Sequence, residues 1–284
     1  MSTAAFLALA LATSPVAQRW MDLSAAQREA QIAAFTDKAL SERLLDASQR
    51  FVGTPYRVSP LGEGTGRDPD PRIRFDAVDC QTFVEETIAL SLATRAAEVE
   101  SLLTELRYHR EPTYEDRNHL MESQWIPHNL QKGFVRDVTS RYGGQDTVQT
   151  AKELTARTWT SKSSVQLALP VDRQPLGTFF LNVIPLKKVS EILHQVPSGT
   201  VMIVVRENLP LKATRVTHLG FVVHKGHRTY LRHATVSAAR VVDEELGGFL
   251  TRNSKYAKWK VIGVSLFEVT SPAAAPRARQ AEQR

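Results

Sequence analysis

The stretch FDAVDCQTFVE, residues 75–85, carries the only cysteine of the chain, Cys80, where a loop turns into an apolar helix. Phe83 and Ile88 begin an apolar pattern of helical spacing, and Asp79 is a suitable N-cap residue. Cys80 then lies in the first helical turn, where the helix dipole and free N–H groups lower the pKa of a thiol. We therefore predict a nucleophilic cysteine here. A small buried cysteine without chemistry is the alternative.

A candidate base lies downstream, in VTHLGFVVHKGHRTYLRHAT, residues 216–235. Its β-branched and aromatic residues flank Lys225 and Gly226, which predicts a β-hairpin. With the turn centred between those two residues, His218 and His233 lie opposite each other on one face. One imidazole can then act as general base toward a thiol while the other orients its ring.

A zinc site is the competing chemical interpretation of these histidines. His224 and His227 flank the predicted turn, and His218, His224 and His233 could converge on one face. The spacings match no compact zinc motif. We therefore expect no metal and no cofactor.

The order of four segments resembles a known family. FVGTPY (51–56), DCQTFVE (79–85), THLGFVV (217–223) and RHAT (232–235) are similar to segments of the DUF1460 family, within the NlpC/P60 papain-like superfamily. Members of that superfamily are cysteine amidases and peptidases that act on bacterial peptidoglycan. The resemblance spans about residues 44–267 in the order of its motifs.

The resemblance implies a role for each matching residue. Cys80 matches the nucleophile, His218 the general base and His233 the third polar residue, while Tyr56 matches a tyrosine placed near the nucleophile. The implied reaction cleaves the N-acetylmuramoyl-L-alanine amide bond of peptidoglycan or muropeptides through a thioester. A γ-D-glutamyl-diamino acid endopeptidase, acyl transfer to another acceptor, and a non-catalytic cell-wall-binding protein are the alternatives.

A second polar segment, residues 114–133, also resembles DUF1460 proteins. Arg117 can hold a carboxylate, and Trp125 can lie against a sugar or peptide face. We predict that Arg117, His119 and Trp125 bind substrate. The alternative is an amphipathic helix with Leu120, Trp125 and Leu130 in the core and the other side chains solvated.

The order of predicted elements favours the α+β class. Helices are expected first and strands later, which suggests a papain-like NlpC/P60 core with a mostly antiparallel sheet packed on the nucleophile helix, plus helical N-terminal and insertion segments. The chain length fits one catalytic domain over residues 21–270. Helices are expected within 22–50, 97–107 and 185–196, strands at 179–184, 201–206, 216–223, 229–235 and 260–269, and an insertion or substrate-side loop at 145–174.

Both ends of the chain carry their own signals. Residues 4–12 are apolar and residues 14–17 offer small residues for cleavage, so we predict a signal peptide within residues 1–20 and a periplasmic or secreted protein. An ordinary hydrophobic helix is the alternative. The tail 271–284, rich in Ala, Pro, Arg and Gln, is expected to be disordered.

Charge and cysteine content limit the other classes. The net charge of +6 suits anionic cell-wall polymers, but the chain has no nucleic-acid motif, so no nucleic-acid partner is expected. A single cysteine excludes an intramolecular disulfide. Beyond the N-terminal segment, we expect no stable membrane insertion.

Overall fold

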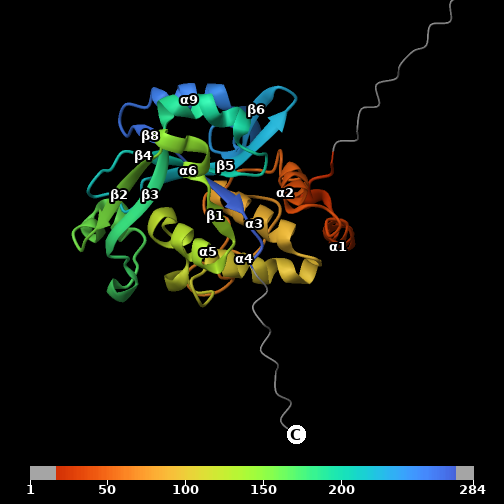
Figure 1. Ribbon diagram of the computed structural model, residues 1–284. Coiled ribbons are helices and arrows are strands. Elements are labelled where there is room, and N and C mark those ends of the chain that lie inside the picture. Colours follow the sequence, from red (N-terminus) through yellow and green to blue (C-terminus); the bar gives the residue numbers. More distant parts are fainter. Residues whose placement is uncertain (1–16, 273–284) are drawn as a thin grey trace, which may run out of the picture.

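The computed structural model describes residues 17–272, which form a mixed structure of helices and a mostly antiparallel open sheet (Figure 1). This architecture is consistent with the predicted α+β class. The predicted signal segment up to residue 16 and the tail from residue 273 lie outside the described residues. Within the described part of the chain, no helix has both the length and the apolar character needed to cross a membrane.

One sheet forms the centre of the molecule, with strand order β2-β3-β8-β4-β5-β6-β7 and β1 paired to β8. Every pairing between these strands is antiparallel. The strands are β1 (Val135–Asp137), β2 (Val148–Leu154), β3 (Gly177–Pro185), β4 (Val201–Arg206), β5 (Val216–Lys225), β6 (Arg228–Thr235), β7 (Arg240–Glu245) and β8 (Val261–Val269).

Helices cover both faces of this sheet. In Figure 1, α9 lies above it and α3, α4 and α5 lie below it. The helices are α1 (Ala25–Ala33), α2 (Leu40–Gln49), α3 (Cys80–Leu92), α4 (Val99–Arg107), α5 (Ile126–Lys132), α6 (Thr139–Gly143), α7 (Lys162–Val165), α8 (Leu186–Ile192) and α9 (Leu246–Ser254), with a π-helical turn η4 (Met121–Trp125) before α5.

The sheet separates two hydrophobic cores, one on each face, and strand β4 contributes side chains to both. Val201, Ile203 and Val205 pack with the apolar residues of α2, α3 and α4. Met202 and Val204 belong to the opposite core, with apolar residues of α8 and α9. Both faces of the strand are therefore buried, which explains a continuous apolar run in place of an alternating one.

The predicted helix at Cys80 is confirmed, and its start is fixed by the residue before it. The Asp79 carboxylate accepts hydrogen bonds from the N–H groups of Gln81 and Thr82, and the Thr82 hydroxyl accepts from the Asp79 N–H at 2.9 Å. This reciprocal capping satisfies donors that a helix N-terminus leaves free. The helix then packs against β5 and β6, with Phe83 in contact with Phe221.

The other predicted strands and helices are present, but one segment differs. Residues 148–154, placed in a polar loop by sequence, form β2 and pair with β3 along its whole length. The strand lies at the sheet edge and most of its side chains are exposed, so no apolar period marks it. The elements β7 and α9 were also not predicted, and both contribute to the site described next.

Candidate active site

Cys80 is the first residue of α3 and keeps part of its surface exposed. The Asp79 carboxylate beside it also accepts from the Ser59 N–H at 3.1 Å. The sulfur of Cys80 faces the backbone N–H of Leu219 on β5 as well as N–H groups at its own helix start. Within residues 17–272, the Cys80 N–H donates to no oxygen, so it is free to bind a ligand.

The pKa of this thiol differs from the sequence-based expectation. Burial raises the pKa of Cys80 to about 12, and the Asp79 carboxylate adds to the rise. The N–H groups of Leu219, Cys80 and Gln81 lower the pKa but do not offset these effects. The predicted low pKa is therefore wrong for the free protein, because desolvation and the capping carboxylate outweigh the helix terminus. The Cys80 side chain is therefore a neutral thiol near pH 7.

The histidine hairpin has a different register from the predicted one. Lys225 pairs with Arg228, so the turn residues are Gly226, with φ of 58°, and His227. The predicted pairing of His218 directly opposite His233 is wrong by two residues. Continuing the observed register places Gly220 opposite His233, and a Cβ on Gly220 would lie 2.8 Å from the His233 Cβ.

The two histidines nevertheless meet, on the diagonal of the ladder. His218 Nε2 lies 2.5 Å from His233 Nδ1, and the ring planes are inclined by 82°. Gly220 leaves the space between the strands that this diagonal contact requires. Phe249 of α9 packs against both rings, at centroid distances of 5.9 and 5.6 Å.

Both imidazoles are neutral near pH 7. Burial lowers the pKa of His218 to about 3, with the His233 ring as a further cause. Burial also lowers the pKa of His233 to about 4, and the Arg252 charge contributes. A neutral imidazole has one N–H and one lone pair, so each ring can donate one hydrogen bond and accept another.

Two residues that sequence reasoning missed, Glu244 and Arg252, extend the row of contacts that begins with His218 and His233. The Glu244 Oε2 of β7 lies 3.2 Å from His233 Nε2, and the Arg252 guanidinium of α9 contacts Glu244 at 3.0 Å. No sequence signal identified them, because their strand and helix were themselves not predicted.

Tyr56 lies beside Cys80, and its backbone pairs with two other segments of the chain. Its N–H donates to the Ala239 carbonyl at 2.9 Å, and the residue forms a β-bridge with Val78. Burial raises the pKa of Tyr56 to about 12, and charges at Cys80 and Asp79 add to the rise. The phenol is therefore within electrostatic reach of the thiol.

The predicted substrate-binding residues of the second segment are engaged inside the protein. Arg117 is buried and donates to Glu63 at 2.6 Å and to Asp68 at 2.8 Å. Trp125 has 0% exposed surface, and its indole N–H donates to Glu85 at 2.9 Å. Trp125 thus has no exposed ring face, and Arg117 has its carboxylate partners within the chain.

His119 is the third residue of that prediction. Its Nε2 lies 2.6 Å from the Tyr114 carbonyl oxygen, and its ring packs against the Tyr114 ring. Burial lowers the pKa of His119 to about 4, although the carbonyl of Tyr114 opposes the shift. His218 and His233 lie on the α9 face of the sheet against Phe249, whereas Cys80 packs with the core on the α3 face. The second segment adjoins the cysteine helix, because the Gln81 side chain donates to the Asn118 carbonyl and the Trp125 indole donates to Glu85.

The third histidine of the zinc interpretation lies apart from the pair. His224 Nε2 is bonded to the Val196 carbonyl oxygen at 2.7 Å and its backbone N–H to Ser198. Over residues 17–272, no group of three or more His, Cys, Asp or Glu side chains is placed to hold a metal ion.

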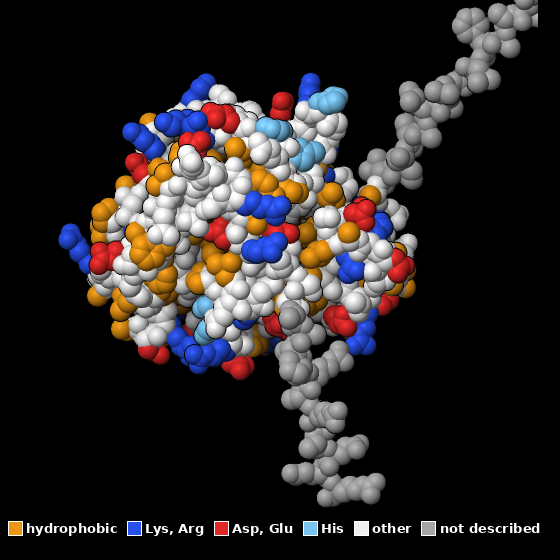
Figure 2. All heavy atoms as spheres, viewed as in Figure 1, with side chains coloured by type: hydrophobic (Ala, Val, Ile, Leu, Met, Phe, Trp, Pro, Cys, Tyr) orange, Lys and Arg blue, Asp and Glu red, His pale blue; other side chains and the backbone are white. Residues whose placement is uncertain are grey.

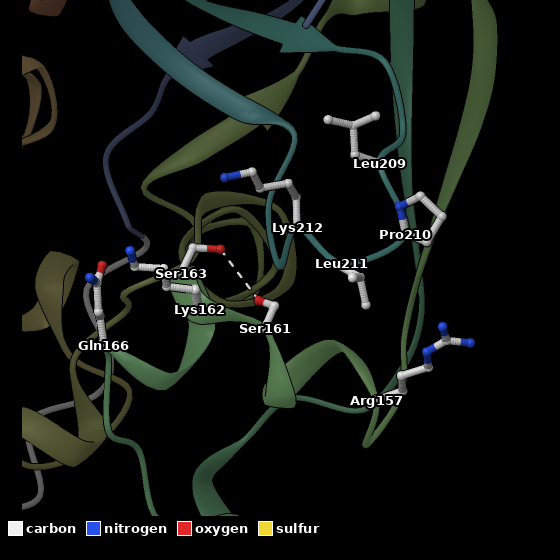
Figure 3. A pocket seen from close by; sticks show the side chains of 9 residues that line it. All are labelled: Arg157, Ser161, Lys162, Ser163, Gln166, Leu209, Pro210, Leu211 and Lys212. Atoms are coloured by element: carbon white, nitrogen blue, oxygen red, sulfur yellow. Dashed lines mark hydrogen bonds between the residues drawn. The ribbon is translucent and has the colours of Figure 1, made fainter.

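An open cleft of about 710 Å³ lies away from Cys80, between residues 157–166 and the loop before β5. Figure 3 shows Lys162 and Lys212 directed to one side of this cleft and Arg157 to the other. The cations therefore do not converge on one ligand position. On the face in Figure 2, Lys and Arg side chains are interspersed with Asp and Glu, so no continuous basic patch suggests a polyanion site there.

Comparison with known proteins gives this site its context. Solved structures with a similar fold include the DUF1460-family protein LPG0564 of Legionella pneumophila, with a TM-score of 0.75 and 22% identity over 87% of this chain and 95% of that one. An N-acetylmuramoyl-L-alanine amidase of Bacteroides uniformis has a TM-score of 0.66 and 21% identity over 82% and 99% of the two chains. No curated protein sequence matches the chain. The model of the AmiA-like family, described as N-acetylmuramoyl-L-alanine amidase-like, matches residues 46–256, and the chain belongs to this family.

Proposed function

We propose that this protein is a cysteine-dependent amidase with an NlpC/P60 papain-like core, which hydrolyses the bond between N-acetylmuramic acid and L-alanine in muropeptides. Membership of the amidase-like family supports the substrate class. The observation that carries the mechanism is the contact of His218 Nε2 with His233, next to the Leu219 N–H that faces the Cys80 sulfur. The substrate class also agrees with the proposed periplasmic or secreted location.

The contact assigns different tasks to the two nitrogens of His218. His233 engages Nε2, which leaves Nδ1 of His218 as the atom to accept the thiol proton. The His218 ring packs against Phe249, whereas the sulfur lies at the backbone of the next residue, Leu219. Phe249 belongs to the core on the α9 face and Cys80 packs with the core on the α3 face, so proton transfer requires the His218 side chain to turn from its position in this structure toward the sulfur.

Acylation follows from these positions. The Cys80 sulfur attacks the lactyl carbonyl carbon as its proton passes to His218, and the oxyanion accepts a hydrogen bond from the free Cys80 N–H. The C–N bond then breaks, and protonated His218 returns the proton to the departing amine of L-alanine. Because the thiol has a raised pKa and His218 is neutral, attack and proton transfer occur together, without a resting ion pair.

Deacylation uses the same base. A water molecule attacks the thioester carbonyl and gives a proton to His218, and the C–S bond breaks as the sulfur recovers a proton. The products are the muramoyl carboxylate and a free peptide that begins with L-alanine. Tyr56 lies close enough to influence charge at the sulfur during both steps.

The test is incubation of wild-type protein and Cys80→Ala with defined muropeptides, with and without a metal chelator, followed by mass spectrometry. We expect an intact peptide beginning with L-alanine, formed only by the wild type and in equal amount with chelator. Fragments containing L-alanyl-D-glutamate would instead support the γ-D-glutamyl-diamino acid endopeptidase. Loss of product with chelator would favour a metal mechanism, and unchanged but bound substrate would favour a binding protein.

A further inference from the structure

We propose that Glu244 is a positioning residue which, held by Arg252, fixes the proton arrangement of His233 and through it the basic nitrogen of His218. This inference deepens the proposed function and rests on the assignment of His218 as the base. It concerns a carboxylate from β7 and a guanidinium from α9, two elements that pack against the histidine strand.

One carboxylate lies close to the outer ring nitrogen of His233, Nε2. His233 is 0% exposed, so water does not reach its ring in this conformation. Its Nε2 has no well-aligned hydrogen bond among the described residues, yet the Glu244 Oε2 lies 3.2 Å away. A small rotation of either side chain aligns the two atoms. A buried ring N–H without an acceptor is costly, which favours that rotation.

The state of Glu244 decides which nitrogen of His233 carries the proton. An ionised carboxylate can only accept, so His233 Nε2 must carry the proton and its Nδ1 must be the lone pair. The lone pair on Nδ1 then requires His218 Nε2 to donate. His218 Nδ1 is left unprotonated, which is the form that a general base for a thiol must have.

Arg252 keeps Glu244 in the accepting form. Its Nη1 lies 3.0 Å from Glu244 Oε1, and its Nη2 donates to Oε2 at 3.0 Å. Partial burial raises the pKa of Glu244, and the Arg252 charge opposes that rise. Other charged groups that influence the histidines are Arg206, which lowers the pKa of His218, and Asp243, which raises that of His233.

Enzyme kinetics provide the first test, with Glu244→Ala and Glu244→Gln. Loss of the acceptor allows the opposite proton arrangement, so we expect kcat of Glu244→Ala to fall about 10- to 100-fold with KM nearly unchanged. Glutamine keeps an acceptor oxygen and should retain more activity than alanine. Glu245→Gln is the matched control, since it removes the same charge from an exposed neighbour on β7 and should leave kcat unchanged.

A second measurement reads the protons directly and does not depend on turnover. In protein labelled with ¹⁵N-histidine, long-range ¹H–¹⁵N NMR should show the wild-type proton on Nε2 of both His218 and His233. In Glu244→Ala, the His233 signals should shift toward protonation at Nδ1, whereas Glu245→Gln should match the wild type. His218→Gln and His233→Gln provide the assignments.

These readouts separate a positioning role from a structural one. The half-exposed Arg252 offers a milder change, and Arg252→Gln should give a kcat loss of about two- to tenfold in the same direction. A wild-type spectrum with the proton on Nδ1 of His233 would overturn the inference, as would unaltered proton positions in Glu244→Ala. If the muropeptide assay fails while the NMR result holds, the proposed reaction is wrong and the proton arrangement remains.

Discussion

Two polar regions of this molecule contain similar residue types but differ in how their side chains are bonded. At the histidine hairpin, His218 and His233 are neutral, partner each other and leave one nitrogen of His218 uncommitted. Around Arg117, charged groups neutralise one another, with Glu63 and Asp68 on a single guanidinium. The first region keeps a proton acceptor free, whereas the Arg117 guanidinium in the second is bonded to two carboxylates of the chain.

The difference shows what residue type alone does not reveal. Arginine, histidine and tryptophan all occur in ligand sites, but each is equally able to close a buried network. The proposed mechanism requires a donor and an acceptor that folding leaves free. The backbone N–H of Cys80 and Nδ1 of His218 meet this condition, and the Trp125 indole, bonded to Glu85, does not.

Removing the proposed base should produce the largest effect. We expect His218→Gln to lower kcat/KM for muropeptide hydrolysis about 10⁴-fold, since the thiol then has no proton acceptor. The control is His227→Gln, which changes an exposed turn residue of the same hairpin and should keep the wild-type rate. Initial rates at one pH decide the matter, and a His218→Gln enzyme within tenfold of the wild type would remove His218 from the mechanism.

Substitution of Arg117 should lower the stability of the protein. Arg117→Ala leaves the buried Glu63 carboxylate without its ion pair, and we expect the free energy of unfolding to fall by about 3–5 kcal/mol. Arg57→Ala, which breaks an exposed pair with Asp70, should cost less than about 1 kcal/mol. Urea unfolding measures both. An Arg117→Ala protein of normal stability but raised KM would restore Arg117 to the substrate site.

Much of the fold was accessible from sequence because its signals are local. The Asp79 cap, the apolar period of α3 and the apolar run of β4 each depend on neighbouring residues and predicted the observed elements. Strand β2 was missed because an exposed edge strand has no apolar alternation. Its pairing with β3 is a property of the folded chain.

The sequence suggested candidate site residues but not their arrangement. Cys80, His218 and His233 remain predictions, and the predicted hairpin register was wrong by two residues because the turn is formed by Gly226 and His227. The pKa of Cys80 was also predicted in the wrong direction, because burial is a long-range property. Glu244 and Arg252 lie on elements that carried no clear period.

Tyr56 offers a smaller test of the reactive region. If its hydroxyl stabilises charge near the sulfur, Tyr56→Phe should lower kcat about 10- to 100-fold, which corresponds to one hydrogen bond to a charged group. Tyr256→Phe, at an exposed position, is the control. Wild-type kcat in Tyr56→Phe, measured alongside thermal stability, would assign Tyr56 to packing alone.

The smallest expected effect concerns the pH dependence of stability. His218 and His119 should affect this dependence in the same way, whereas only His218 should affect activity. The pKa of folded His218 is about 3 and that of His119 about 4, below the unfolded value of about 6.5, so the unfolded chain binds more protons between these limits. Each histidine therefore contributes stability that is present above about pH 6.5 and lost as pH falls toward its folded pKa.

Replacing either histidine should flatten the dependence of unfolding free energy on pH between about pH 4 and 6, by up to about 1.4 kcal/mol per pH unit. Urea unfolding across this range of pH gives the slopes for His218→Gln, His119→Gln and the exposed control His227→Gln, whose slope should equal the wild type. Only His218→Gln should also abolish hydrolysis. A raised KM in His119→Gln would instead connect the second region to substrate binding, because a histidine that only closes an internal contact with Tyr114 has no means of altering KM.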